Sequence, residues 1–284
     1  MFRNVIVGVD GRQGGRDATA LAKQLVAGDG KLALAYVQLG ELSSVPGSGA
    51  AFEPTERERA LALLTAARDE SKIGARLLLK RSPAAGRGLH ELAESEHADL
   101  LVVGSTSHGL IGRVLIGDDS RGALNGAPCA VAIAPAGYSE RPSALSEIGV
   151  GYNGSPESQH ALSVARALAA AHGARVSAFE AVSLPAYTVG GATTRAAAQA
   201  GELVDLARER ISALGDVEPH AAYGSAAEEL ALYGAAVDLL IVGSRGYGPL
   251  GRIMHGSVSE KLARTARCPL LVLTRGARER DASN

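Results

Sequence analysis

Tryptophan is absent from the chain, and aromatic residues make up only 4% of its 284 residues. A core without them depends on Ala, Val and Leu, which suits Ala-rich helices covering a parallel sheet. The two cysteines, Cys129 and Cys268, lie in no Cys-x-x-Cys motif and beside no histidine at ligand spacing, which argues against a metal centre and a disulfide scaffold. We interpret both as buried small hydrophobes, with redox sensing as the alternative.

The chain also lacks a membrane span, a signal peptide and an excess of positive charge. No stretch approaches the roughly 18 uninterrupted apolar residues of a membrane helix. The N-terminal MFRNVIVGVD has no charged region followed by a long apolar segment. The formal net charge is −1, so no basic footprint indicates a nucleic-acid partner. We therefore expect a soluble cytoplasmic protein with neither nucleic acid nor membrane as a partner.

One structural unit is present twice. Residues 98–105 (ADLLVVGS) and 237–244 (VDLLIVGS) are near-copies 139 positions apart, and the two cysteines share that spacing. A polar, Pro-containing stretch at 137–144 is the predicted linker. The duplication predicts a first domain at 1–140, a second at 145–276 and a polar tail at 277–284.

Each half predicts the element order β-α-β-α-β-α-β-α-β. In the first half, a strand at 4–9 is followed by a Gly14-Gly15 turn and an apolar stripe with helical spacing. The remaining expected strands lie at 31–37, near 75–81, within 98–105 and at 130–134, and in the second half at 175–182, near 217–223, at 239–242 and at 270–274. This order favours two tandem doubly wound α/β domains, each a five-stranded parallel sheet with helices on both faces. Ligands of such sheets bind at the carboxyl ends of the strands.

The most informative stretch is 237–259, VDLLIVGSRGYGPLGRIMHGSVS. It predicts a buried strand, a glycine-rich turn and a new helix, whose N-cap we assign to Ser257 because Glu260 stands three residues later. Glycines allow close backbone approach, and a helix start presents free N–H groups to an anion. The pattern alone fits a phosphate site and a simple capped turn equally well.

The spacing Gly243-x2-Gly246-x9-Gly256-Ser257 resembles the nucleotide loop of the universal stress protein family, in its ATP-binding branch. This resemblance covers nearly the whole chain and implies a fold like that of the adenine-nucleotide α-hydrolases. It implies ATP or another adenine nucleotide as ligand, with or without Mg²⁺, and a role as a sensor or regulator with a protein partner that the sequence does not identify. It also implies that the last strands of the halves pair as an internal pseudo-dimer; a homodimer of the whole chain stays open.

The first half departs from the family loop. Ser107 stands where the second glycine is expected and Asp118 where the phosphate-binding Ser is expected. Two like charges about 4 Å apart repel by roughly 4 kcal/mol at an effective dielectric near 20. We therefore expect this half to bind ATP weakly or not at all, unless Asp118 only caps a helix and points outward. The residues expected to line the weaker pocket are Val9, Asp10, Val37, Gly104 and Gly117.

The second half has the complete loop but has Asn153 at the position of Asp10, the acidic residue that the family resemblance expects. An amide provides both a donor and an acceptor and could still pair with an adenine edge. Arg245 could meet a phosphate or stay solvated, and Tyr152 could stack on a base or pack beside the strand. The residues expected to bind nucleotide are Gly151, Tyr152, Asn153, Ala181, Val242, Gly243, Arg245, Gly246, Gly256, Ser257, Val258 and Ser259.

Other functions have weaker support. Gly246-x-Gly248-x-x-Gly251 matches a dinucleotide fingerprint by letters, but no helix opens there and no P-loop motif exists. A Ser-Gly-Gly loop of an α-hydrolase is absent after the first strand. No nucleophile–base pair is visible, so we expect no more than slow, incidental ATP hydrolysis and no metal centre. The alternative outside nucleotide binding is an interaction module whose two pockets have decayed, which the residues Asp118 and Asn153 favour.

Overall fold

The structure, a computed structural model of the chain, describes residues 1–40, 54–105, 122–183, 193–244 and 257–274. These residues form one ten-stranded sheet with the order β3-β2-β1-β4-β5-β10-β9-β6-β7-β8. The first-half strands are β1 (Phe2–Gly8), β2 (Val26–Leu39), β3 (Ala75–Ser82), β4 (Leu100–Gly104) and β5 (Ala130–Ala134). Those of the second half are β6 (Glu147–Gly151), β7 (Arg175–Val182), β8 (Glu218–Tyr223), β9 (Leu239–Gly243) and β10 (Leu270–Leu273).

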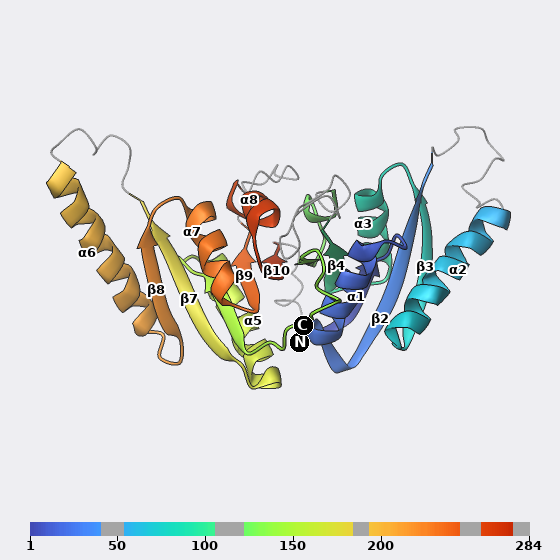
Figure 1. Cartoon of the computed structure of the whole chain (residues 1–284), viewed down its shortest axis with the longest axis horizontal. Helices are drawn as coiled ribbons and strands as arrows, with labels where there is room; N and C mark the ends of the chain where they lie inside the picture. Colours follow the sequence, from blue (N-terminus) through green and yellow to red (C-terminus); the bar gives the residue numbers. More distant parts are fainter. Residues whose placement is uncertain (41–53, 106–121, 184–192, 245–256, 275–284) are drawn as a thin grey trace.

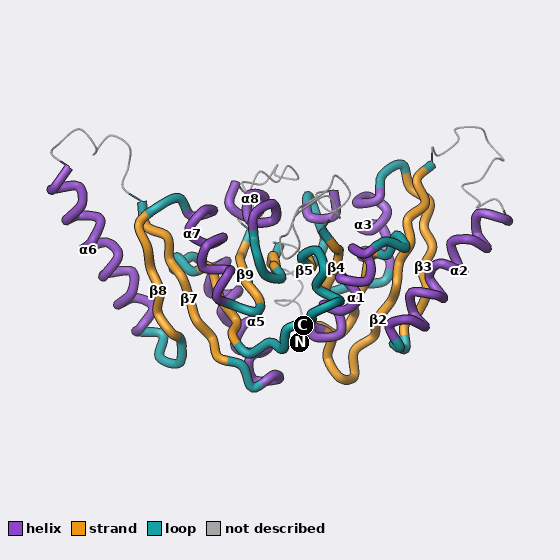
Figure 2. Tube along the Cα trace, viewed as in Figure 1, coloured by secondary structure: helices purple, strands orange, loops and turns teal. Residues whose placement is uncertain are grey.

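Helices cover both faces of the sheet, as expected from the alternating element order. The first half contains α1 (Gln13–Leu25), α2 (Pro54–Ser71) and α3 (Ala85–Ser95). The second contains α5 (Pro156–His172), α6 (Thr193–Ser212), α7 (Ala226–Tyr233) and α8 (Ser257–Thr265). Figures 1 and 2 show the halves side by side, with α2 and α6 at the two outer ends.

Neighbouring strands within each half are parallel, which confirms the predicted doubly wound domains. The first strand of each half lies between the second and the fourth, so the chain direction across the sheet reverses there. The carboxyl ends of β1 and β4, and of β6 and β9, are therefore the two switch points at which doubly wound sheets bind ligands.

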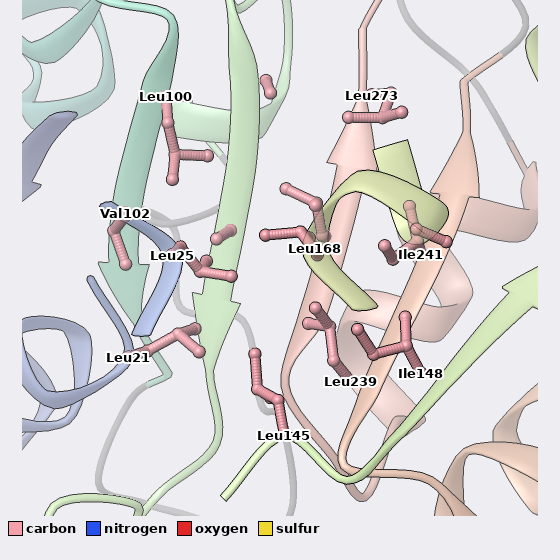
Figure 3. Packing of buried hydrophobic residues seen from close by; sticks show 14 of the residues in the cluster. Leu21, Leu25, Leu100, Val102, Leu145, Ile148, Leu168, Leu239, Ile241 and Leu273 are labelled. Carbon is pink, nitrogen blue, oxygen red and sulfur yellow. The ribbon is translucent and has the colours of Figure 1, made fainter. Parts of the chain in front are cut away.

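The halves are joined through their last strands, as expected. β5 and β10 are antiparallel, with Leu271 opposite Ala132. The Thr274 hydroxyl donates to the Cys129 carbonyl at 2.8 Å across the same junction. The core of each face is continuous over this junction, and Figure 3 shows Leu145 between leucines of α1 and Leu239 of β9. The sheet is thus one layer rather than two separate ones.

Two local predictions are wrong. Gly14 and Gly15 lie inside α1 rather than in a turn before it, because the chain turns earlier, at Gly11, where φ is +77°. β2 begins at Val26, before the expected residue 31, and includes a register shift relative to β1. The helix predicted from residue 257 is present as α8, which begins at Ser257, and the residues before it lie outside the described part of the chain.

Candidate functional site

The described part of the second site gathers at the ends of β6, β7 and β9. A Cβ built on Gly151 would lie 3.1 Å from Val242, so β6 and β9 approach closely there. Ala181 comes from β7, the other neighbour of β6. In α8, Ser259 is buried and Val258 packs against the hydrophobic core. Arg245, Gly246 and Gly256 lie outside the described residues, as does the side chain of Ser257.

The described part of the first site has the same arrangement. Val9 and Asp10 follow β1 directly, Val37 lies in β2, and Gly104 ends β4. Gly117 and Asp118 lie outside the described residues.

The last glycine of each fourth strand has a packing role that the sequence analysis missed. A Cβ on Gly104 would lie 2.0 Å from the carbonyl oxygen of Gly14 in α1. A Cβ on Gly243 would lie 2.8 Å from the carbonyl oxygen of Glu157 in α5. Real Cβ atoms do not approach this closely, so any larger residue would push the first helix away from the strand. Each glycine sets the distance between a helix N-terminus and the switch point.

Asp10 and Asn153 make the same backbone turn. Oδ1 of Asp10 accepts a hydrogen bond from the N–H of Arg12 at 3.0 Å, and Oδ1 of Asn153 accepts one from Ser155 at 3.2 Å. Gly154, like its counterpart in the first half, has a positive φ of +76°. This turn uses one oxygen in each half and is equally available to Asp and Asn. What remains for a ligand is an acceptor oxygen on Asp10 and a donor amide on Asn153.

A buried hydroxyl follows each fourth strand. Ser105 and Ser244 are each 3% exposed, and the hydroxyl oxygen of each has no hydrogen-bond partner among the residues that the structure describes. Their backbone N–H groups donate to the last strand of their own half, to Ala134 at 2.9 Å and to Leu273 at 3.0 Å. A buried hydroxyl without a partner costs free energy, so a ligand or a water molecule beside either one would be stabilised. These serines were visible in the repeated VGS motif, but sequence analysis gave them no role.

Tyr152 belongs to the core. Its side chain is 6% exposed and packs with the cluster under α5, while its backbone N–H donates to Phe179 at 2.9 Å. Of the two interpretations of this residue, the packed aromatic is therefore the one that the structure supports. A base could contact its backbone but could not stack on a ring at this depth.

The second half also has an ion pair beside the candidate pocket. The guanidinium of Arg210 in α6 binds the buried Glu180 carboxylate through two contacts, at 2.7 and 3.2 Å. Glu180 precedes Ala181, and the Cδ atom of Arg210 lies 4.0 Å from a Cβ built on Gly154. The strand registers place Tyr36 at the corresponding position of the first half. The only sequence signal was a glutamate inside the apolar strand RVSAFEAV.

The cysteines are buried, as expected for small core residues. Burial raises the pKa of the Cys268 thiol from its ordinary value of 9.0 to about 12, so the thiol is protonated at neutral pH. Because the thiolate is the reactive form, a redox role for Cys268 is disfavoured. No helix among the described residues has both the length and the apolarity to cross a membrane.

The fold and its two switch points define a class of protein: a tandem α/β protein with the fold of the adenine-nucleotide α-hydrolases, here as two fused copies. A model of the universal stress protein family matches residues 1–135 and, a second time, residues 145–274. The chain therefore belongs to the universal stress protein family and is a tandem member of it.

Individual relatives agree with this assignment. A universal stress protein of Thermus aquaticus, encoded in the QAH/OAS sulfhydrylase 3' region, is 35% identical over 130 residues, which is 43% of this chain and 93% of the relative. One from Mycobacterium tuberculosis is 31% identical over 186 residues, 63% of this chain; the match spans only 62% of that relative. The crystal structure of a universal stress protein from Archaeoglobus fulgidus has a TM-score of 0.67 at 19% identity and covers 96% of this chain and 98% of its own, which supports the fold alone.

Proposed function

We propose that this universal stress protein binds an adenine nucleotide, ATP in the first instance, and acts as a sensor or regulator. The binding site is mainly the second half, at the carboxyl ends of β6 and β9. The observation that supports this most directly is the position of α8. It begins at Ser257, directly after the complete glycine loop that follows β9. A helix N-terminus at a switch point is where phosphate groups bind in such sheets.

The described residues fit a nucleotide in two further respects. The buried hydroxyl of Ser244, at the start of the glycine loop, has no hydrogen-bond partner in the described part of the chain. The amide of Asn153 retains a donor after the turn has used its oxygen. A donor at this position would favour contact with a ring nitrogen or a sugar oxygen, whereas Asp10 would favour the exocyclic amine of adenine.

A metal ion would depend on the nucleotide itself. No group of three His, Cys, Asp or Glu side chains among the described residues could hold a metal. Mg²⁺ commonly binds through substrate phosphates and one or two carboxylates, and it would neutralise phosphate charge here. We expect hydrolysis of the bound ATP to be slow and incidental.

Titration calorimetry with ATP on the full chain tests the proposal. We expect one site in the unmodified protein, loss of binding in Gly256→Asp, and a gain of binding in Asp118→Ser. The introduced carboxylate would oppose a phosphate by roughly 4 kcal/mol at 4 Å and an effective dielectric near 20, enough to abolish measurable binding. A matched Gly201→Asp variant, on the exposed surface of α6, should bind normally.

Two results would contradict the assignment. A single site that survives Gly256→Asp and disappears in Gly117→Asp would place the nucleotide in the first half. An absence of heat with ATP, together with no adenine nucleotide in mass spectra of the extracted protein, would favour an interaction module with decayed pockets.

A further inference from the structure

The turn after β6 places an asparagine directly before a glycine. Asn153 is exposed, and Gly154 follows it with a φ of +76°. A residue with a side chain would be strained at this φ, so the turn that leads into α5 favours glycine at this position. Glycine also leaves its backbone nitrogen unhindered, because it has no Cβ. The same turn that the fold requires therefore creates a chemically reactive Asn-Gly pair in the second half.

The reaction of such a pair is an intramolecular substitution. The Gly154 nitrogen gives its proton to water and bonds to Cγ of Asn153, while the Cγ–Nδ2 bond breaks and Nδ2 takes up a proton and leaves as ammonia. The product is a succinimide ring that joins the two residues. Water then opens the ring. Cleavage between Cγ and the Gly154 nitrogen gives aspartate, whereas cleavage at the main-chain carbonyl gives isoaspartate, and water is the only co-reactant.

The hydrogen bond within the turn favours the first step. The Ser155 N–H donates to Oδ1 of Asn153 at 3.2 Å. This bond closes a ring of atoms that contains both Cγ of Asn153 and the Gly154 nitrogen, so the attacked carbon and the attacking nitrogen are held on the same side of the chain. The same N–H stabilises the negative charge that develops on Oδ1 as the new bond forms.

The two reacting groups are free and accessible. Neither the Gly154 N–H nor the Asn153 NH₂ group makes a hydrogen bond to a described residue. Among the described residues, a Cβ built on Gly154 would have only the Cδ atom of Arg210 within contact distance, at 4.0 Å. The surrounding backbone is held, because the Gly154 carbonyl accepts from the Gln159 side chain at 3.2 Å. No bond has to break before the reaction starts.

Two other described asparagines differ from Asn153 in these respects. Asn125 also precedes a glycine, Gly126, whose φ is +78°. It is half-buried directly after the helical segment at 122–124, and its side chain accepts no hydrogen bond from a described residue. Asn4 precedes Val5 within β1, and its side-chain amide donates to the carbonyl of Glu96. Only Asn153, among these three, combines a following glycine with a donor on Oδ1.

From these observations we propose that Asn153 is a modification site, which deamidates in the folded protein through a succinimide with Gly154. Aspartate, the product that retains the main chain, makes the turn already present at Asp10, whose Oδ1 accepts from the Arg12 N–H at 3.0 Å. The conversion changes the formal net charge from −1 to −2. It also replaces the donor amide at the end of β6 with an acceptor; that this group faces a nucleotide rests on the proposed function.

Peptide mass spectrometry of the full chain, incubated at neutral pH in heavy-oxygen water, tests the proposal. Aspartate formed during the incubation carries the heavy oxygen and is thereby separated from earlier conversion. In the folded chain, Asn153 should convert about tenfold faster than Asn125, as expected for one hydrogen bond to a developing charge. In urea, where the turn is lost, the two asparagines should convert at similar rates. Isoelectric focusing should show the more acidic form accumulating at the rate measured for Asn153.

Two variants of Ser155 isolate the donor. The φ of Ser155 is −69°, which proline adopts, so Ser155→Pro removes the N–H and should slow conversion of Asn153 about tenfold. The matched control Ser155→Ala retains the N–H and loses only the side-chain cap, which accepts from the Ser158 N–H at 3.3 Å. It should convert as the unmodified protein does. Circular dichroism confirms that each variant is folded.

The proposal is overturned if Asn153 converts no faster than Asn125 in the folded chain, if it converts more slowly in the folded chain than in urea, or if Ser155→Pro converts at the unmodified rate. Where Ser155→Pro does not fold, the comparison of Asn153 with Asn125 in the unmodified protein decides. All of these rates are measured without nucleotide. This proposal and the proposed nucleotide site, which calorimetry tests, therefore fail separately.

Discussion

Asp17 provides a strong test of how the two halves are joined. This carboxylate is 0% exposed, although it lies in α1 beside a linker. Besides the backbone N–H groups of Gly137 and Ser139, it accepts from the Ser139 hydroxyl at 2.7 Å and from the Gln13 amide at 3.1 Å. Asp17→Ala removes all four acceptor contacts and leaves a small cavity. It should lower the free energy of unfolding by about 3 kcal/mol, because hydrogen bonds to a charged group contribute about 1.5–3 kcal/mol each and water can replace some of them at the half-buried linker.

Asp17→Asn is the sharper variant. It preserves the shape but replaces one acceptor oxygen with an NH₂ group that faces an N–H donor. We expect a loss of about 1.5 kcal/mol, intermediate between the unmodified chain and Asp17→Ala. The control is Asp69→Ala. The exposed Asp69 carboxylate forms an ion pair with the adjacent Arg68 at 3.1 Å, and its removal should change stability by less than about 0.5 kcal/mol.

Urea unfolding followed by far-UV circular dichroism measures the stability of these variants. Limited digestion with a glutamate-specific protease measures release of the linker, because Glu140 is exposed within it. Cleavage after Glu140 should accelerate in the order unmodified, Asp17→Asn, Asp17→Ala. Substitutions on the surface usually change the free energy of unfolding by no more than about 0.5 kcal/mol. If the effect of Asp17→Ala is that small and its linker is cut at the unmodified rate, then Asp17 does not hold the linker.

Three further outcomes follow from described contacts. Gly243→Ala should lower the urea midpoint, since its Cβ would meet the backbone of α5. Gly201→Ala, in a helix with open space around that position, should raise stability by about 1 kcal/mol. Equal effects of the two variants would contradict the packing role of Gly243. Cys268 should resist a thiol reagent at pH 8 until urea unfolds the chain, and rapid labelling of the native protein would refute this. Because the pKa of Cys268 is raised in the folded state, the stability gained from its neutral form is complete below pH 9 and declines as the pH rises toward 12. Arg210→Ala should lower the free energy of unfolding, measured in urea, by about 2 kcal/mol, because Glu180 would stay buried without its cation. Adding Glu180→Gln to that variant should recover part of the loss, and no recovery would mean that the loss comes from packing.

The element order and topology were predictable because they depend on local patterns that occur twice. The apolar stripe of α1 and the buried runs at 100–104 and 239–243 are near-copies of features in the other half, and each supports the other. Pairing of the last strands was expected from the family resemblance, and it agrees with apolar sequences at an edge that would otherwise be exposed. Short-range periodicity determines such features, so the sequence alone is sufficient to predict them.

The contacts between distant backbones were not predictable in the same way. Gly104 was assigned to ligand approach, yet it meets Gly14, ninety residues away in the sequence. Gly14 was assigned to a turn because it precedes an apolar stripe, and its presence inside α1 makes sense only when β4 is beside it. The buried partners of Asp17 likewise depend on where the linker crosses α1, which no local pattern encodes.

These contacts change how the differences between the halves should be understood. From the sequence, Asn153 is the absence of an expected acidic residue. In the structure it makes the same turn as Asp10 and differs only in the group left free for a ligand. The backbone turn after the first strand is therefore the same in both halves, while the side chains beside it differ. The second half has a donor in place of an acceptor, and the Glu180–Arg210 ion pair in place of Tyr36. The distinction between the two strand ends is thus chemical: Asn153 has a free donor group where Asp10 has a free acceptor.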